Sequence, residues 1–248
     1  MEHARGHHTT VPAHRIPPHE RLILALDVPG PRAARETVEG LGDVVRFYKV
    51  GLELFAAGGC LELMEWLLGR GKRIFADLKL FDVPNTVAAA VTQLGGRGID
   101  FVTVHGNDAI LEAACRAAGD RVGVLAVTAL TSLDQRDMEE LGFQTDLREL
   151  VLSRARRAMA LGCAGVVASG REAAALRGEL GAQPLIVVPG IRPPRDDRPD
   201  DQKRTVDVEE AFAAGADYIV VGRPIRKAPN PTAAARRLQH RIERLFPE

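Results

Sequence analysis

From residue 21 onward, short apolar runs rich in Val, Ile and Leu alternate with longer segments rich in Ala, Leu, Arg and Glu. The short runs have the length of β-strands. Several of them, such as YIVVG and LIVVP, are apolar at nearly every position, which is typical of strands in a parallel sheet that is covered on both faces. The pattern predicts eight strands, at residues 21–27, 45–50, 73–79, 100–105, 121–128, 164–169, 184–189 and 217–222.

The segments between these strands have helical composition, most clearly LELMEWLLG and ELVLSRARRAMALG. Pro84 is well placed to open one helix. Gly69, Gly162 and Gly215 fall where the C-terminal caps of helices are expected. Eight strand–helix units in 248 residues predict an α/β protein of one domain, a (β/α)8 TIM barrel with right-handed crossovers. A doubly wound open sheet is the alternative, and eight similar units in this length favour closure.

The first twenty residues contain five of the seven histidines and show no apolar periodicity. This composition favours a disordered extension. A metal-binding tract is the alternative, although no regular ligand spacing supports it. The predicted organisation is therefore a His-rich extension at residues 1–20, followed by the barrel domain at residues 21–248.

Apolar residues make up 46% of the chain and charged residues 27%, and the formal net charge is zero. Because neither sign of charge is in excess, we expect no nucleic-acid partner and no anionic membrane surface. No apolar run approaches the roughly 20 residues that span a bilayer. The N-terminus also lacks the basic-then-apolar layout of a signal peptide. We therefore expect a cytoplasmic protein.

The three cysteines, Cys60, Cys115 and Cys163, are far apart in the sequence and form no CxxC pair. An odd and scattered set argues against a disulfide framework or a structural zinc site. Each cysteine falls in or beside an apolar stretch, so we interpret all three as buried thiols.

The active site of a (β/α)8 barrel lies where the strands end and the βα loops begin. The third strand ends in DLKLFDVPNT, where alternation places Asp77 and Lys79 on one face, roughly 7 Å apart, with Leu78 and Leu80 on the other. The chain has only five lysines against 28 arginines, and lysine is the cation that readily gives up its proton. An unpaired charge inside the barrel would cost several kcal/mol, so we expect Asp77 and Lys79 to neutralise each other near the rim.

Lys49 lies near the end of the second strand, Asp82 follows the third, and Asp27 ends the first. Together with the Asp77 and Lys79 pair, Lys49 and Asp82 form a candidate catalytic cluster of four charged residues, two carboxylates and two ammoniums, and Asp27 is a further candidate beside it. A structural ion-pair cluster is the alternative, with Lys49 extending its amine out of a core strand and Asp27 capping a turn.

A phosphate site is indicated separately by PGIRP after the seventh strand and GRP after the eighth, since these loops commonly bind phosphate in such barrels. Gly190 and Gly222 allow backbone N–H groups to approach an anion closely. Arg192 and Arg223 can each present a forked donor to phosphate oxygens.

The blocks at these strand ends resemble one family. DLKLFDVPNT resembles the D-x-K-x-x-D-[IV]-P-x-T signature of the orotidine 5′-monophosphate decarboxylases. LALD, YKVG, VTVHG, LAVTALTS, VPGIRP, DDQKR and YIVVGRP are similar to further blocks of that family, in the same order. The resemblance covers roughly residues 21 to 240. It implies a homodimeric barrel that converts orotidine 5′-monophosphate to UMP and CO2 without a metal or another cofactor.

The resemblance also implies roles for individual residues. Lys79 is the general acid that protonates C6 of the pyrimidine, and Asp77 lies against the substrate carboxylate. Lys49 and Asp82 complete a network of alternating charges, and a partner subunit supplies Asp82 and Thr86. The substrate-binding residues are Asp27 and Lys49 for the ribose, Thr131 or Ser132 for the pyrimidine, and Arg192, Gln202, Gly222 and Arg223 for the 5′-phosphate, with Pro189 as a further contact.

Two other functions are weighed against this one. A sugar-phosphate enzyme on the same barrel, such as 3-keto-gulonate-phosphate decarboxylase or hexulose-phosphate synthase, shares the D-x-K-x-x-D strand end but uses magnesium and an enediolate intermediate. The VPNT and PGIRP blocks favour the nucleotide enzyme. A non-catalytic phosphate-binding barrel is the other alternative, and the joint presence of the four charged residues argues against it.

Overall fold

The structure is a computed structural model and describes residues 16–192 and 205–247. Residues 1–15, which include most of the His-rich extension, and Gln202 lie outside the described residues. The strands are β1 (Leu22–Ala25), β2 (Phe47–Gly51), β3 (Arg73–Leu80), β4 (Phe101–Val104), β5 (Gly123–Val127), β6 (Gly165–Val167), β7 (Leu185–Val188) and β8 (Tyr218–Val221).

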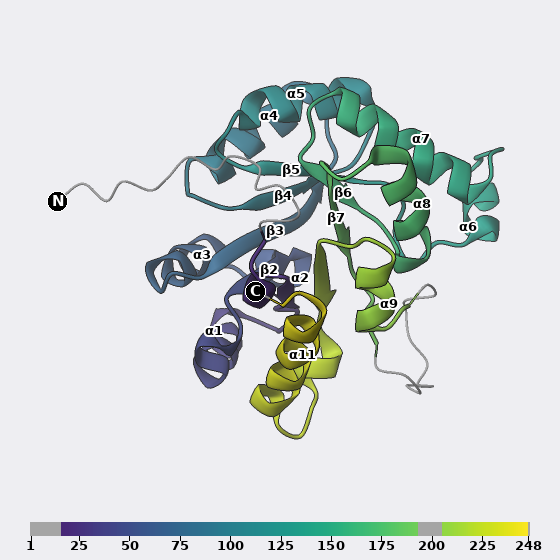
Figure 1. The fold of residues 1–248 in the computed structure, drawn as a ribbon. Coiled ribbons are helices and arrows are strands. Elements are labelled where there is room, and N and C mark those ends of the chain that lie inside the picture. The colour runs from purple at the N-terminus through teal and green to yellow at the C-terminus, as the bar shows by residue number, and fades with distance from the viewer. Residues whose placement is uncertain (1–15, 193–204, 248) are drawn as a thin grey trace.

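These strands form one closed parallel barrel in sequence order, in which β8 pairs with β1. The helices surround the strands, and α4 and α5 lie side by side (Figure 1). The helices are α1 (Pro31–Leu41), α2 (Leu52–Ala56), α3 (Cys60–Gly69), α4 (Pro84–Gly95), α5 (Asp108–Ala118), α6 (Gln135–Glu140), α7 (Leu147–Ala160), α8 (Gly170–Leu180), α9 (Val208–Ala213), α10 (Arg223–Arg226) and α11 (Pro231–Leu245), with short 3-10 turns η2 (Pro18–Glu20) and η3 (Gly42–Val44). The predicted (β/α)8 barrel is confirmed, and the open sheet is excluded.

The ends of the helices follow the predicted signals with one correction. Pro84 is the first residue of α4. Gly162 and Gly215 follow α7 and α9 with φ angles of 85° and 95°, the left-handed region that glycine adopts without steric cost. The prediction for Gly69 was wrong, because this residue is the last one of α3 and the left-handed position belongs to Gly71, at φ 68°.

Ile16, which precedes residue 21, is packed against the barrel. Ile16 is only 4% exposed and joins the apolar cluster inside the barrel. Glu20, in the turn η2, forms an ion pair with Arg73 at the start of β3. The sequence did not predict that this segment packs on the barrel, because one buried isoleucine in a histidine-rich stretch produces no apolar periodicity.

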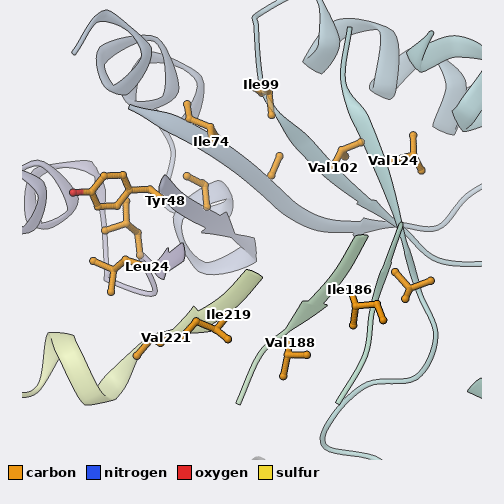
Figure 2. Close-up of a cluster of buried hydrophobic side chains, with 14 of the residues drawn as sticks. Leu24, Tyr48, Ile74, Ile99, Val102, Val124, Ile186, Val188, Ile219 and Val221 are labelled. Carbon is orange, nitrogen blue, oxygen red and sulfur yellow. The ribbon is translucent and has the colours of Figure 1, made fainter. Parts of the chain in front are cut away.

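Each strand contributes to two apolar cores, because alternate side chains point to opposite faces. The outward side chains pack beneath the helices; Figure 2 shows part of this cluster, including Leu24, Tyr48, Ile74, Val102, Val124, Ile186, Val188, Ile219 and Val221. The inward side chains fill the barrel near the starts of the strands, among them Ile23, Phe47, Phe75, Phe101, Leu125 and Tyr218. The apolar filling ends part of the way along the strands, so polar side chains can occupy the inside of the barrel near its carboxyl end.

Gly165 in β6 packs against the backbone of β7, and replacing it with alanine should destabilise the fold. An added Cβ would lie 2.1 Å from the carbonyl oxygen of Leu185, which is its partner in the strand ladder. We expect Gly165→Ala to cost about 3 kcal/mol of unfolding free energy and to lower Tm by ~6–12 °C. The matched control is Gly178→Ala in α8, where no heavy atom lies within 4 Å of the added Cβ. That variant should gain about 0.5–1 kcal/mol, so equal Tm values for the two variants would contradict the packing argument.

Candidate active site

A cavity of about 530 Å3 lies at the carboxyl ends of the strands. Residues in the strands or directly after them contribute to its walls, from every strand except β4, and the lining also contains apolar side chains such as Phe75 and Val220. The predicted site residues that line this cavity are Asp27, Lys49, Asp77, Lys79, Thr131, Pro189, Arg192, Gly222 and Arg223. Residues that are spread over most of the sequence therefore share one cavity.

The alternation of the strands carries charged groups into this cavity. Phe47 points into the barrel, and Lys49 follows on the same face of β2 two residues later. In β3 the buried Phe75 is followed in the same way by Asp77. The apolar side chains that fill the barrel near the strand starts are therefore followed, toward the carboxyl ends, by the charged side chains of the cavity.

The charged groups form a continuous chain of ion pairs. The ammonium of Lys49 lies 3.3 Å from Asp27 Oδ1 and 3.3 Å from Asp77 Oδ2. The ammonium of Lys79 lies 2.9 Å from the other carboxylate oxygen, Asp77 Oδ1. Lys49 therefore does not extend its amine out of the core, and positive and negative groups alternate along the cavity wall.

Burial and pairing oppose each other at these groups, and pairing prevails. Burial alone would raise the pKa of Asp77, but the ammonium groups of Lys49 and Lys79, with hydrogen bonds from Lys79 and Thr103, hold the pKa of this carboxyl below its usual range. Burial alone would lower the pKa of Lys49, but the carboxylates of Asp77 and Asp27 raise it above its usual value. Both groups are therefore charged at neutral pH.

The backbone of β3 is irregular at its carboxyl end. Lys79 has a φ of 48°, the one positive value found at a non-glycine residue of the described chain, and the pairing of β3 with β4 shifts register between Ala76 and Leu80. Such a conformation costs about 1–3 kcal/mol and persists only where its surroundings hold it. The buried hydroxyl of Thr103 in β4 does so, because it accepts a hydrogen bond from the Lys79 N–H at 2.8 Å and donates one to Asp77 Oδ1 at 3.0 Å.

Thr103 was missed by the sequence reasoning. It is fully buried and lies behind the paired groups, so it positions both Asp77 and Lys79. The available signal was a single hydroxyl residue within the apolar run FVTV of β4, on the face that also carries Phe101.

A second group of cations lines the cavity from the loops that follow β7 and β8. Gly190 has a φ of 77°, and Arg192 is fixed by a bond from its N–H to the carbonyl of Val206 at 3.0 Å. Arg223 begins α10 directly after Gly222. Arg192 and Arg223 thus belong to the two segments for which phosphate binding was predicted. Gln202, predicted for the same site, lies outside the described residues.

Arg226 and Lys227 also line the cavity, and sequence reasoning missed them. Arg226 lies three residues after Arg223, so one helical turn brings both to the same side. Its guanidinium is 3.8 Å from Asp27 Oδ2, which connects this cationic group to the chain of ion pairs.

Three predicted residues do not line the cavity of their own chain. Asp82, Thr86 and Ser132 are exposed. Asp82 Oδ1 accepts a short hydrogen bond of 2.6 Å from the Val83 N–H, which orients the carboxylate within its loop. Of the two predicted contacts to the pyrimidine, the structure places Thr131 rather than Ser132 at the cavity.

No described helix is long and apolar enough to cross a membrane. Within residues 16–192 and 205–247, no group of three or more His, Cys, Asp or Glu side chains is arranged to hold a metal ion. The cytoplasmic location and the independence from cofactors stay predictions.

The fold and the cavity together define a (β/α)8 barrel whose charged site, at the carboxyl ends of the strands, suits an anionic ligand. A family model described as "Orotidine 5'-phosphate decarboxylase / HUMPS family" matches residues 20–238. The chain belongs to this family.

Individual relatives agree with that assignment. The chain is 59% identical over 231 residues to an orotidine 5'-phosphate decarboxylase of Methylococcus capsulatus, covering 93% of this chain and 95% of that protein. Among solved structures, it is similar to orotidine 5'-phosphate decarboxylase from Lactobacillus acidophilus, with a TM-score of 0.79, 34% identity and coverage of 92% and 100% of the two chains. The enzyme of the same name from Pyrococcus horikoshii has a TM-score of 0.71 at 28% identity, with coverage of 90% and 99%.

Proposed function

We propose that this chain is an orotidine 5′-phosphate decarboxylase, a carboxy-lyase that converts orotidine 5′-monophosphate to UMP and CO2 in pyrimidine biosynthesis. One observation carries the proposal. Asp77 and Lys79 form a close pair at the wall of a cavity that Arg192 and Arg223 also line. A substrate with a carboxylate at its reacting carbon and a phosphate at its other end matches these two groups of charges.

The reaction leaves an electron pair on C6 of the pyrimidine, and no neighbouring carbonyl or imine accepts it. When the bond from C6 to the carboxylate breaks, CO2 departs and the electron pair stays on the ring carbon. The Lys79 ammonium stabilises this charge as it develops, which is the interaction that lowers a barrier. Lys79 then gives its proton to C6 and regains one from solvent.

Asp77 and Lys49 hold this acid in place. Asp77 is charged and lies 2.9 Å from the Lys79 amine, so it orients the proton donor and repels the substrate carboxylate. The ammonium of Lys49 forms an ion pair with the second carboxylate oxygen of Asp77. An arginine at position 79 would supply the positive charge but could not release the proton.

Contacts far from the reacting carbon hold the substrate in register. Asp27 and Lys49 bind the ribose hydroxyls in this proposal, and Thr131 binds the pyrimidine. Pro189 supplies a further contact. The phosphate is bound by Arg192, Gln202, Arg223 and the N–H of Gly222. Binding energy from the phosphate and ribose can be used to position the reacting end.

The active unit in this proposal is a homodimer in which each subunit supplies Asp82 and Thr86 to its partner's cavity. Both residues are exposed and absent from the cavity of their own chain. The apolar side chains beside them support a covered surface, since Phe81 is 68% exposed and Val83 is 62% exposed. Large apolar side chains gathered on a surface mark interaction sites.

The magnesium-dependent sugar-phosphate enzymes are the nearest alternative, and the names of the relatives favour the nucleotide enzyme. The deciding experiment follows the loss of orotidine 5′-monophosphate absorbance with purified protein in EDTA. We expect rapid conversion to UMP that does not depend on added metal. A folded protein that leaves this substrate unchanged, yet acts on a hexulose or keto-gulonate phosphate once magnesium is added, would contradict the proposal.

Arg223→Ala should weaken substrate binding, because a forked donor to the phosphate is removed. We expect kcat/KM to fall about 10- to 100-fold, mainly through KM. The matched control is Arg32→Ala, in which an arginine with a 93% exposed side chain is removed from the surface. A kcat/KM equal to that of the control would count against the phosphate role.

A further inference from the structure

The fold brings together two of the three cysteines, which the sequence separates. Cys115 belongs to α5, and Cys163 lies between α7 and β6. Their sulfur atoms are 3.2 Å apart, and both thiols are free. The helices α5 and α7 are neighbours on the outside of the barrel (Figure 1). Since a disulfide bond is about 2 Å long, the sulfurs need to approach by only about 1 Å.

The pair lies at a second cavity, of about 410 Å3, near the starts of the strands. Cys115 and Cys163 both line it, together with Gly119, Met159 and Gly162. None of the residues that line this cavity lines the catalytic one. A small oxidant can therefore reach the thiols without entering the catalytic cavity.

The two thiols are not equivalent. Cys163 is 8% exposed, whereas Cys115 is half-buried. The contact between the two sulfurs lowers the pKa of Cys115, against the effect of burial, and the same contact together with burial raises the pKa of Cys163. The thiolate is the reactive form of cysteine, and an oxidant in the cavity meets the more exposed Cys115 first, so Cys115 is the attacking group and Cys163 the one that resolves the intermediate.

We propose that Cys115 and Cys163 form a reversible disulfide when a hydroperoxide reaches the second cavity, and that this bond ties α5 to the start of β6.

The chemistry takes place in two steps. The Cys115 thiolate attacks a peroxide oxygen, the O–O bond breaks, and the departing oxygen takes up the proton that the thiol lost, which leaves Cys115 as a sulfenic acid. The Cys163 sulfur then attacks the Cys115 sulfur. The S–S bond forms, the S–O bond breaks, and the hydroxide leaves as water with the proton of Cys163. Two thiols are oxidised and the peroxide is reduced, hydrogen peroxide to two waters and an organic hydroperoxide to one alcohol and one water.

The bond should stabilise the barrel. It joins positions 48 residues apart and encloses β5, α6 and α7. Closing a loop of this length restricts the unfolded chain, and we expect Tm to rise by about 5–15 °C. The third cysteine, Cys60, is buried in α3, which lies outside the segment that the bond encloses.

The test uses the wild-type protein, treated with hydrogen peroxide, alkylated and digested without reductant. We expect one cross-link, between the peptides that contain Cys115 and Cys163, with Cys60 recovered in alkylated form. Tm should rise with the cross-link and return after treatment with dithiothreitol. Recovery of both cysteines as alkylated or sulfinic forms without a cross-link, or a cross-link to Cys60, would overturn the proposal.

Two variants complete the design. Cys60→Ser should form the cross-link and show the Tm shift like the wild type. Cys163→Ser should show neither, and its Cys115 should be trapped as a sulfenic acid by dimedone. A cross-link in the wild type without a rise in Tm would overturn the stabilising role of the bond. The mapping of the wild-type protein does not depend on the folding of either variant.

Discussion

Replacing Lys79 with alanine is expected to lower kcat by at least roughly a thousandfold, the upper range for one preorganised electrostatic donor. The Lys79 ammonium lies at the cavity beside Asp77, where its side chain is 35% exposed, compared with 13% for Lys49. Without it, the developing charge on C6 has neither a stabilising group nor a proton donor. The buried Asp77 remains paired with Lys49, so the fold should persist while the chemistry is lost.

Lys79→Arg separates the two roles of this side chain. It restores a positive charge beside Asp77 but cannot donate the proton, so its kcat should stay far below that of the wild type. Single-turnover assays of both variants, with Tm measured alongside, provide the comparison. Near-normal turnover by a folded Lys79→Ala protein would show that Lys79 is not the general acid.

Asp82→Ala is expected to lower kcat on the order of 100-fold or more, although Asp82 does not line the cavity of its own chain. In the proposed dimer the carboxylate of Asp82 belongs to the partner's charge network. Its loss therefore removes one member of each site in a symmetric dimer. The mutation should leave the fold of each subunit intact, because Asp82 is exposed on its own chain.

Mixing the two inactive proteins tests the shared site directly. After dissociation and random reassociation of Lys79→Ala and Asp82→Ala subunits, half of the dimers are mixed, and each mixed dimer contains one site with both residues. About one quarter of the wild-type activity should return. Activity that stays at the level of the separate variants, in a sample shown to contain mixed dimers, would place Asp82 outside the partner's site.

The order of the elements could be read from the sequence because it depends on local pattern. The eight apolar runs coincide with the eight strands, and a parallel sheet of this length that is covered by helices has few ways to close. The placement of Asp77 and Lys79 at one cavity followed from the alternation of a strand. The irregular backbone at Lys79 could not be predicted in this way, since it accompanies a register shift and a hydrogen bond to Thr103 of the next strand.

Misses occurred where one residue or one distant contact decided the outcome. Ile16 packs inside the barrel although its surroundings in the sequence are polar. Gly71 rather than Gly69 takes the left-handed position after α3, because helix ends depend on which carbonyls find partners.

By itself, the sequence determined the barrel, the strand ends at which the site lies, and the residue types available there, because periodicity and turn chemistry are local properties. The tertiary structure decided which of those residues meet. Lys49 lies between Asp27 and Asp77, Arg226 reaches Asp27, and Cys115 contacts Cys163 across 48 residues. Contacts of this kind depend on closure of the barrel, which sets the distance between strands and helices far apart in the chain. No local pattern of hydrophobic and polar positions carries that information.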